Sequence, residues 1–249
     1  MKNEIEKPFL DRIKKLEDKL GYTFKDKTLP LTALTHRSFV AEYPKKLKDY
    51  EVLEFLGDAV LSLIVSEILI KAYPDAKEGE LSQIRSAVIS EAYLSKLARM
   101  IGLNELVLLS KGEIQQKGME RESLLCDVFE AVFGAIYVDC GYFIDPPRQV
   151  FNRLFKEKLL QDIEKGDIPR DYKSLLQIIT QKTLGITPKY RFISAKGPEH
   201  EKIFTMECII TEDLKTTGTG RSKKEAETKA AQKAYIQLKN HQENQREKN

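Results

Sequence analysis

Two apolar stretches of the chain, YEVLEFLGDAVLSLIV and SLLCDVFEAVFGAIYVD, carry acidic residues inside them. The acids are Glu51, Glu54 and Asp58 in the first stretch and Asp127 and Glu130 in the second. Both stretches have the composition of buried helices, yet acids are almost never fully buried without a partner. The fold must therefore provide these carboxylates with solvent, a positively charged partner or a bound cation.

Helical spacing places the acids of each stretch on one face. An α-helix turns about 100° per residue, so Glu54 and Asp58, four residues apart, lie within about 40° of each other. Glu51 lies on nearly the same face, and Asp127 and Glu130 are three residues apart. If the two helices pack side by side, four carboxylates converge, and a divalent cation would remove their mutual repulsion. All-oxygen ligands favour Mg²⁺ or Mn²⁺ over zinc, and such a site can activate water for in-line phosphoryl displacement.

Other interpretations of these acids are open. The carboxylates could be solvated or paired with lysine and arginine side chains elsewhere in the chain. Glu51, and Glu78 in the segment KEGEL, lie near helix starts, where an acid interacts favourably with the helix dipole. A di-iron carboxylate bundle requires Glu-x-x-His motifs, and none of His36, His200 and His241 follows a glutamate at that spacing.

Helical periodicity extends over the first two thirds of the chain. Apolar residues recur at steps of three or four from Ile5 to Leu20, before Gly21. The pattern predicts further helices over residues 29–39, 49–73, 79–102, 121–140 and 146–165. Because no period-2 strand of any length appears there, this part is predicted to be all-α. The short polar segment KGDIPRD has the composition of a linker.

The pattern changes after this linker. DYKSLLQIITQKTLG predicts a helix, KYRFISA, EKIFTMECII and KTTGTG predict three strands, and SKKEAETKAAQKAYIQL predicts a closing helix with one apolar stripe. The predicted organisation is an all-α domain (1–165), a linker (166–171), a small α+β domain of order α-β-β-β-α (172–240) and a polar tail (241–249).

The charge differs between the two parts. Residues 1–168 hold 25 Lys and Arg against 28 Asp and Glu, whereas residues 169–239 hold 14 against 8. A basic small domain indicates a polyanionic partner without identifying it.

The cellular setting is predicted from what the chain lacks. No apolar run reaches the length of a membrane span, and the first residues contain no signal-peptide type of apolar run. Three cysteines without a CxxC pair argue against a disulfide framework or a cysteine zinc site. We therefore expect a reduced, soluble, cytoplasmic protein with no membrane partner.

The segment YEVLEFLGDAVL closely resembles the signature helix of the ribonuclease III family. LTALTHRSF, KEGELSQIRSAVIS and the stretch that ends in the second acid pair resemble other motifs of that family, in the same order. PKYRF, GPEHEKIF and GTGRSKKEAETKAA resemble a double-stranded-RNA-binding domain. The resemblance covers nearly the whole chain, and it implies an all-α nuclease domain followed by a small α+β double-stranded-RNA-binding domain.

The resemblance also implies an activity and assigns residues to it. The activity is endonucleolytic hydrolysis of double-stranded RNA with Mg²⁺, for which Mn²⁺ substitutes, leaving 5′-phosphate and 3′-hydroxyl ends. The expected substrates are ribosomal RNA precursors, messenger duplexes and other structured RNAs. Asp58 and Glu130 match catalytic residues, and Glu54, Asp127 and Glu130 match metal ligands. The matches to accessory acids are Glu51 and Glu78.

The family is homodimeric through the signature helix, with two active sites that cut the two strands. Phe55 matches a position that packs across the dimer interface, and ordinary core packing is the alternative for this side chain. Cys126 stands where the family usually has alanine, and because it is small and apolar we expect little effect.

The start of the closing helix is a candidate RNA contact. SKKE has the pattern of a capping box in which Ser222 caps and Glu225 returns, so Lys223 and Lys224 lie in the first turn. Basic residues at a helix start interact unfavourably with the helix dipole. Their position is explained if a phosphate group of a ligand binds at the same end of the helix. A solvated charge pair is the alternative. By resemblance, the RNA-binding residues are Gln177, Gln181, His200, Lys223 and Lys224, and Ile178 departs from a position that is commonly Glu.

Three further interpretations are weighed against the sequence. GTGTGRSKK lacks the GxxxxGK[ST] spacing of a phosphate loop. His36 stands alone in an apolar helical segment without a nucleophile motif, so no catalytic role is assigned to it. A non-catalytic RNA-binding protein would be indicated by loss of one of the four main acids, and all four are present.

Overall fold

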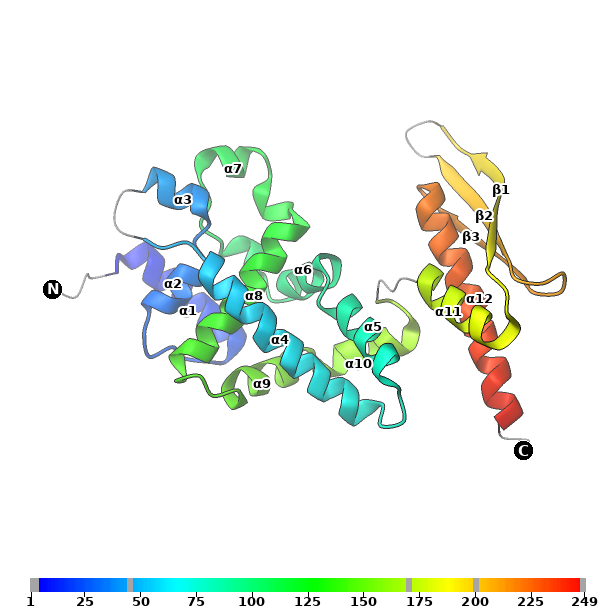
Figure 1. Ribbon diagram of the computed structural model, residues 1–249. Coiled ribbons are helices and arrows are strands. Elements are labelled where there is room, and N and C mark those ends of the chain that lie inside the picture. Colours follow the sequence, from blue (N-terminus) through cyan, green and yellow to red (C-terminus); the bar gives the residue numbers. More distant parts are fainter. Residues whose placement is uncertain (1–4, 44–46, 169–171, 199–201, 247–249) are drawn as a thin grey trace. The chain divides into compact units, whose positions relative to one another are not determined.

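The structure is a computed structural model, and it describes residues 5–43, 47–168, 172–198 and 202–246. The chain divides into two compact units, Met1–Arg170 and Asp171–Asn249. Figure 1 shows that the first unit is helical and that the second contains a three-stranded sheet. The predicted fold class, an all-α domain followed by a small α+β domain, is confirmed.

The first unit consists of helices joined by short loops. They are α1 (Lys7–Leu20), α2 (Thr28–Ala33), α3 (Arg37–Glu42), α4 (Glu51–Ala72), α5 (Glu78–Val88), α6 (Glu91–Met100), η1 (Leu103–Glu105), α7 (Lys111–Gln115), η2 (Gly118–Glu120), α8 (Glu122–Asp139), α9 (Asp145–Phe151), the π-helical turn η3 (Asn152–Lys156) and α10 (Glu157–Lys165). Within the described residues of this unit, β pairing is limited to one bridge between Thr35 and Leu108.

Two of the predicted helices are interrupted in the structure, so these predictions were wrong in part. The stretch 29–39 forms α2 and α3, because the backbone between them pairs with the chain at Leu108. His36 N–H donates to the Leu108 carbonyl over 3.1 Å, and Leu108 N–H donates to the Leu34 carbonyl over 2.7 Å. The stretch 79–102 forms α5 and α6, because Ser90 is extended. Apolar periodicity continues through both breaks and therefore does not reveal them.

Helices α4 and α8 pack against each other in the core of the first unit (Figure 1). From residue 124 to residue 136, Asp127 alone in α8 is not buried. A Cβ atom on Gly57 would lie 1.8 Å from the carbonyl oxygen of Glu130, and one on Gly134 would lie 2.1 Å from that of Leu53. Such distances are far below van der Waals contact, so the two backbones approach this closely only because both positions are glycine.

Aromatic side chains hold the last helices of the unit against α8. The ring centroids of Phe129 and Phe155 are 5.4 Å apart, and those of Phe133 and Phe151 are 5.7 Å apart. Both pairs have the edge-on geometry that aromatic quadrupoles favour. Because most of α8 is packed in the core, the backbone that carries its two acids is fixed there.

The second unit is an antiparallel sheet with helices packed on it. Its elements are α11 (Tyr172–Leu184), β1 (Lys189–Lys196), β2 (Ile203–Ile209), β3 (Lys215–Gly220) and α12 (Lys223–Arg246). The strand order is β1-β2-β3. Met206 and Cys208 of β2 are buried, as the predicted alternation requires, and Thr216 Oγ1 donates to the Ala230 carbonyl over 2.7 Å. The order α-β-β-β-α is confirmed.

The closing helix is longer than the sequence pattern predicts. α12 continues to Arg246, into the stretch expected to be a polar tail. That stretch contains no glycine or proline and several residues of good helix propensity, so nothing in it ends the helix. Its apolar stripe includes Ala226, Ala230 and Ala234, all buried, as predicted.

Two further sequence expectations concern apolar length and cysteines. Within the described parts of the chain, no helix combines the length and the apolar character that crossing a membrane requires. The three cysteines Cys126, Cys140 and Cys208 are free thiols.

The glycine contact between α4 and α8 predicts a large effect of one methyl group. Gly57→Ala or Gly134→Ala should lower the free energy of unfolding by about 3 kcal/mol or more, because backbone atoms must move apart. Gly79→Ala in α5 is the matched control, since a Cβ there meets nothing within 4 Å. Urea denaturation of the three variants measures this, and equal stability of Gly57→Ala and Gly79→Ala would contradict the close contact.

Candidate functional site

The four main acids come from the two helices that meet at the glycine contact. Glu54 and Asp58 lie on α4 on either side of Gly57, and Asp127 and Glu130 lie on α8. Glu130 is 9% exposed, Glu54 and Asp127 are half-buried, and Asp58 is exposed. Within the described residues, none of the four forms an ion pair with lysine or arginine. Within the described residues, the negative charges of these acids are therefore not neutralised by ion pairs with lysine or arginine.

Burial and the charges of neighbouring acids disfavour the ionised forms of Glu54, Asp127 and Glu130. Burial, followed by the charge of Asp58, raises the pKa of Glu130 to about 8. Burial, followed by the charge of Asp127, raises the pKa of Glu54 to about 7. Burial also raises the pKa of Asp127, although a hydrogen bond from Tyr50 opposes the shift. Four carboxylates that influence one another in this way form an electrostatically strained group.

Cys126 is in contact with the most buried of the acids. Its Sγ atom donates to Glu130 Oε1 over 3.6 Å, one helical turn along α8. This bond lowers the pKa of Glu130, but by less than burial raises it. The side chain expected to be a small apolar filler is therefore a hydrogen-bond donor within the acid group.

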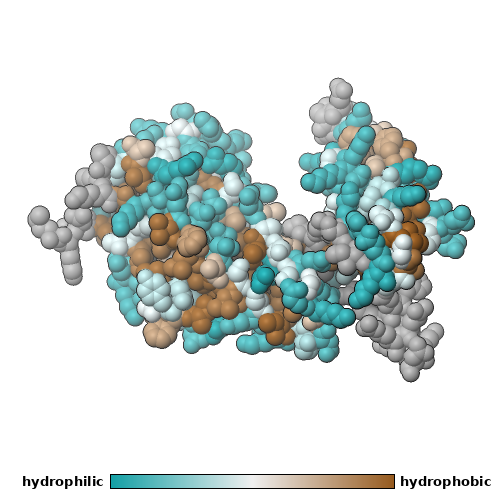
Figure 2. Space-filling view, viewed as in Figure 1, coloured by the Kyte–Doolittle hydropathy of each residue, from teal (hydrophilic) through white to brown (hydrophobic). Residues whose placement is uncertain are grey.

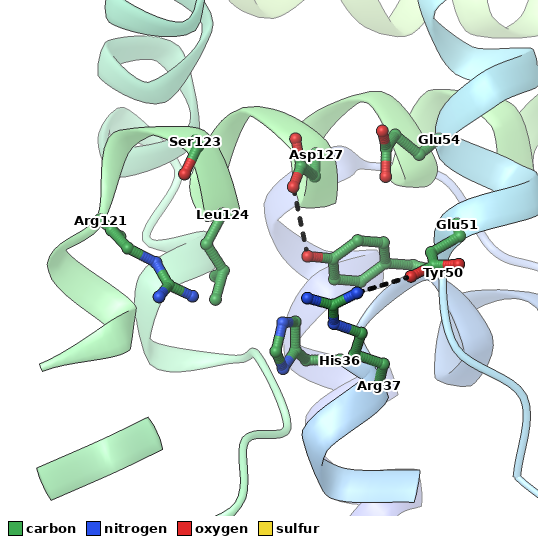
Figure 3. Close-up of a pocket in the computed structure, with 9 residues that line it drawn as sticks. All are labelled: His36, Arg37, Tyr50, Glu51, Glu54, Arg121, Ser123, Leu124 and Asp127. Atoms are coloured by element: carbon green, nitrogen blue, oxygen red, sulfur yellow. Dashed lines mark hydrogen bonds and ion pairs between the residues drawn. The ribbon is translucent and has the colours of Figure 1, made fainter. Parts of the chain in front are cut away.

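A cavity of about 580 Å³ lies next to Glu54 and Asp127. Figure 3 shows the carboxylates of these two residues on one side and the side chains of His36, Arg37 and Arg121 on the other. The full lining is His36, Arg37, Tyr50, Glu51, Glu54, Arg121, Ser123, Leu124 and Asp127. The buried Tyr50 contacts both sides: its hydroxyl donates to Asp127 Oδ2 over 3.4 Å, and its ring centre lies 5.8 Å from that of His36. We call the two sides the acid end and the basic end of the cavity.

The acid group has the chemistry of a divalent-cation site but not a closed geometry. Within the described residues, no three Asp, Glu, His or Cys side chains lie close enough together to enclose a metal ion. The donors are nevertheless carboxylates whose charges lack cationic partners, which is the set that Mg²⁺ or Mn²⁺ prefers. Glu54, Asp127 and Glu130 would hold such an ion after turning toward one another, with Asp58 beside them.

The structure treats the two accessory acids differently. Glu51 lies in the lining of the cavity, with its Oε1 3.8 Å from Arg37 Nη1, and it adds to the repulsion that Glu54 experiences. Glu78 is the exposed first residue of α5, where it accepts a hydrogen bond from Ser82 over 3.0 Å. It does not line the cavity, so within one chain the structure brings Glu51 but not Glu78 to the acid group.

The outer face of α4 is apolar and uncovered. Phe55 is 81% exposed, so the alternative that it belongs to the core is wrong. Val52, Leu63 and Ile70 of the same helix are also exposed, at spacings that place them on one stripe with Phe55. Figure 2 shows apolar side chains gathered over this helix and beside it.

The predicted RNA contacts of the second unit are partly described. Lys223 and Lys224 are exposed in the first turn of α12, and Lys223 Nζ lies 5.3 Å from the centre of the Phe192 ring. Gln177 and Gln181 are exposed on α11, four residues apart. His200 lies outside the described residues, and so does the side chain of Ile178.

The predicted capping box is present with one change. Ser222 Oγ accepts from Glu225 N–H over 3.1 Å, as predicted. Glu225 Oε2 accepts from Arg221 N–H over 2.8 Å, one residue before the expected partner. The cap therefore fixes the first turn of α12, on which both lysines stand.

Comparison with known proteins decides the family. The sequence profile of ribonuclease-III-like domains matches residues 26–163, and that of the double-stranded RNA binding motif matches residues 172–238. Ribonuclease 3 of Aquifex aeolicus is 42% identical over 220 residues, which cover 88% of this chain and 94% of that protein. The chain belongs to the ribonuclease III family.

Other members of the ribonuclease III family support the assignment. Ribonuclease 3 of Myxococcus xanthus is 42% identical over 92% of this chain and 87% of its own length. The solved nuclease domain of ribonuclease III from Campylobacter jejuni is 41% identical, with a TM-score of 0.53 over 58% of this chain and 96% of that domain. The structure of the C. jejuni domain is described as flexible in a region involved in dimer formation.

Several residues of the site in this ribonuclease III chain were not identified from the sequence. They are Tyr50, Arg37, Arg121 and Cys126, together with His36, to which no catalytic role was given. The signal was present, because Arg37 and His36 belong to the LTALTHRSF motif and Tyr50 begins the signature helix. These residues meet in space because of the paths of the loops between the helices. Apolar periodicity in the sequence does not predict those paths.

The raised pKa of Glu130 predicts a pH-dependent effect on stability. The folded protein retains a proton that the unfolded chain releases. The resulting stabilisation is complete below about pH 4.5 and is lost as pH rises through about 8. In EDTA, Glu130→Gln should raise the free energy of unfolding by roughly 1–3 kcal/mol above pH 8, allowing for solvent screening, and should change it little near pH 4.5.

Urea unfolding of wild type and variant at the two pH values measures this difference. Glu105→Gln, at an exposed acid of the same unit, is the control and should show no such pH dependence. A Glu130→Gln effect of the same size at both pH values would contradict the assignment of repulsion to this carboxylate.

Proposed function

We propose that the protein is a Mg²⁺-dependent endoribonuclease that hydrolyses double-stranded RNA and leaves 5′-phosphate and 3′-hydroxyl ends. The observation that carries the proposal is the convergence of Glu54, Asp58, Asp127 and Glu130 at the crossing of α4 and α8. Membership of the ribonuclease III family and the attached double-stranded-RNA-binding domain support the substrate class. Mn²⁺ is expected to substitute for Mg²⁺.

In this mechanism, Glu54, Asp127 and Glu130 are the residues that hold the cation. Bound Mg²⁺ would supply charge stabilisation at the phosphoryl oxygens and a more acidic water. Asp58 and Glu130 are the catalytic residues, and a carboxylate oxygen of one of them accepts the single proton that the water releases as it attacks phosphorus. The bond from phosphorus to the 3′ oxygen breaks in line, and the 3′ oxygen takes up a proton from solvent water and leaves as a hydroxyl. The phosphate stays on the 5′ oxygen of the next nucleotide.

The burial of the acid group supports this chemistry in a second way. A half-buried site has a lower effective dielectric than water, so the carboxylates interact strongly with charge that develops on the phosphate. The packing of α8 in the core restricts movement of Asp127 and Glu130. Rigid support of this kind keeps the reacting groups oriented.

We propose that the active protein is a homodimer that joins through the outer face of α4. Phe55 and the apolar side chains on its stripe form an uncovered surface of the kind that usually mediates association. Glu54 and Asp58 lie on the same helix, so a twofold pairing of these faces would place two acid groups near one interface. The nuclease domain from C. jejuni is described as having a region involved in dimer formation, which supports a dimer for this chain without locating its interface.

We propose that the second unit binds duplex RNA through Lys223 and Lys224, the glutamines of α11 and His200. Duplex RNA is recognised mostly by shape, through phosphates and 2′-hydroxyls. Exposed lysines on a capped helix start offer both positive charge and free backbone N–H groups to phosphate. The linker between the units then raises the effective RNA concentration at the nuclease domain. A cytoplasmic location and processing of ribosomal RNA precursors and messenger duplexes are the roles proposed for this activity.

Cleavage of a long RNA duplex tests the proposed reaction. Purified protein with Mg²⁺ should cut the duplex, EDTA should stop cleavage, and Glu130→Ala should reduce kcat by about a thousandfold or more, because a catalytic and ligating group is lost. Gel electrophoresis of labelled duplex measures the products. If the wild type binds the duplex but leaves it intact with both Mg²⁺ and Mn²⁺, a non-catalytic RNA-binding protein is the correct interpretation.

Salt dependence tests the RNA contacts. Lys223→Ala combined with Lys224→Ala should weaken duplex binding about equally for all sequences and reduce the slope of log K against log salt by about 1 to 2, since each phosphate contact releases counterions. Fluorescence anisotropy in EDTA at several salt concentrations measures the slope. Lys14→Ala, which removes an exposed charge from α1, is the control. An unchanged slope in the double variant would exclude these lysines as phosphate contacts.

A further inference from the structure

The cavity beside the acid group is larger than the proposed metal site needs. At roughly 30 Å³ per water, a cation with six waters occupies about 200 Å³. The cavity has about 580 Å³, which lies within the usual range of pockets for small organic ligands. The acid end accounts for the cation, and the basic end has no role in the mechanism given above.

Two arginines lie at the basic end, each near one acidic side chain. Arg121 Nη2 lies 2.9 Å from Glu113 Oε1, and Arg37 Nη1 lies 3.8 Å from Glu51 Oε1. Each guanidinium carries five N–H donors, so one carboxylate contact leaves further donors free to bind a ligand. The planar fork of arginine matches the geometry of a phosphate group. One close ion pair at Arg121 and one long contact at Arg37 therefore leave both guanidinium groups available to a phosphate in the cavity.

His36 adds a hydrogen-bond donor to the same wall. It is 8% exposed, and its Nδ1 accepts from Ser38 N–H over 3.2 Å, where it caps α3. An Nδ1 atom that accepts from a backbone amide carries no hydrogen, so the neutral ring carries its hydrogen on Nε2. Nε2 has no hydrogen-bond partner among the described residues, and the ring lines the cavity (Figure 3). Nε2 is not one of the buried polar atoms that lack a partner, so its N–H is open to the cavity and can donate to a ligand there.

The start of α8 contributes to the same region. Arg121 is the N-cap of this 18-residue helix and makes no side-chain cap bond, and Ser123 and Leu124 of the first turn line the cavity. The first N–H groups of a helix lack intrahelical partners and favour an anion. Positive charge, the N–H donor of His36 and a helix start therefore face the same space.

We propose that the basic end of the cavity binds the phosphate next to the scissile one on the cleaved strand, with Arg37, Arg121 and His36 Nε2–H as donors. The inference rests on the proposed function, because it assumes that the acid end acts on an RNA phosphate. The cavity then fixes the register of the strand: one phosphate binds at the basic end while its neighbour lies at the carboxylates. The three residues are substrate-binding residues, and they exchange no proton with the reacting atoms.

A protein–substrate double-mutant cycle tests this inference on the full chain. The probes are RNA duplexes in which one phosphate at a time near the cleavage site is replaced by an uncharged methylphosphonate. With wild type, kcat/KM should fall about 10- to 100-fold for one flanking position, the loss expected for a charge-assisted hydrogen bond. On the duplex with all its phosphates, Arg121→Ala should have a kcat/KM lower than wild type by a similar factor. Replacing the phosphate at that flanking position should then lower the kcat/KM of Arg121→Ala only slightly further, because the contact is already lost.

Matched variants separate binding of phosphate from support of the fold. Glu113→Gln breaks the ion pair of Arg121 but keeps the cation, so it should retain most of the activity. Arg37→Ala removes only a long, exposed ion pair and should behave as Arg121→Ala does. His36→Asn keeps an N-cap acceptor for α3 but withdraws the Nε2–H donor, so a several-fold loss is expected. Lys14→Ala should change nothing.

The outcomes distinguish this inference from the proposed function. If the wild type cuts no duplex, the proposed function fails. The wild type could cut while each methylphosphonate lowers kcat/KM by the same factor in Arg121→Ala as in wild type. That result would overturn the phosphate site. Equal losses for Glu113→Gln and Arg121→Ala would also overturn it, because they would show that the ion pair matters only for the fold.

Discussion

The contact between the backbones of α4 and α8 determines the rest of the nuclease domain. Gly57 and Gly134 have no side chains, so each helix approaches a carbonyl oxygen of the other. The acids flank this contact, and their separation therefore depends on it. Burial at the crossing raises the pKa of Glu54 and Glu130, and the core around α8 holds the strained group in place. The free energy of packing thus offsets the repulsion of the carboxylates.

Helix α4 has a different role on each of its faces. Its inner face meets α8 through Gly57, its acidic face carries Glu54 and Asp58, and its outer face presents Phe55 and other exposed apolar side chains. This combination explains why the helix is apolar almost all round although it lies at the surface of the chain. On the proposal of a dimer, the same helix joins the core, the catalytic acids and the interface, so a change on one face affects the others.

The sequence predicted the elements better than the contacts between them. Alternation of Met206 and Cys208 identified β2, and apolar spacing identified α4 and α8, because these signals are local. The breaks at His36 and Ser90 were missed, since they depend on pairing with Leu108 and on an extended residue inside an apolar pattern. The acids were identified because buried charge is rare, whereas Arg121 and Tyr50 were missed because exposed arginines and buried tyrosines are common.

Binding of Mn²⁺ tests most directly whether the acids of α4 and α8 form a divalent-cation site. The signal of free Mn²⁺ in electron paramagnetic resonance gives the affinity of the full chain without RNA. The wild type should bind the ion, and Glu54→Gln combined with Asp127→Asn should weaken binding at least about tenfold. Glu212→Gln, at an exposed acid of the other unit, should leave the affinity unchanged. Equal affinity of the wild type and the double variant would contradict the account.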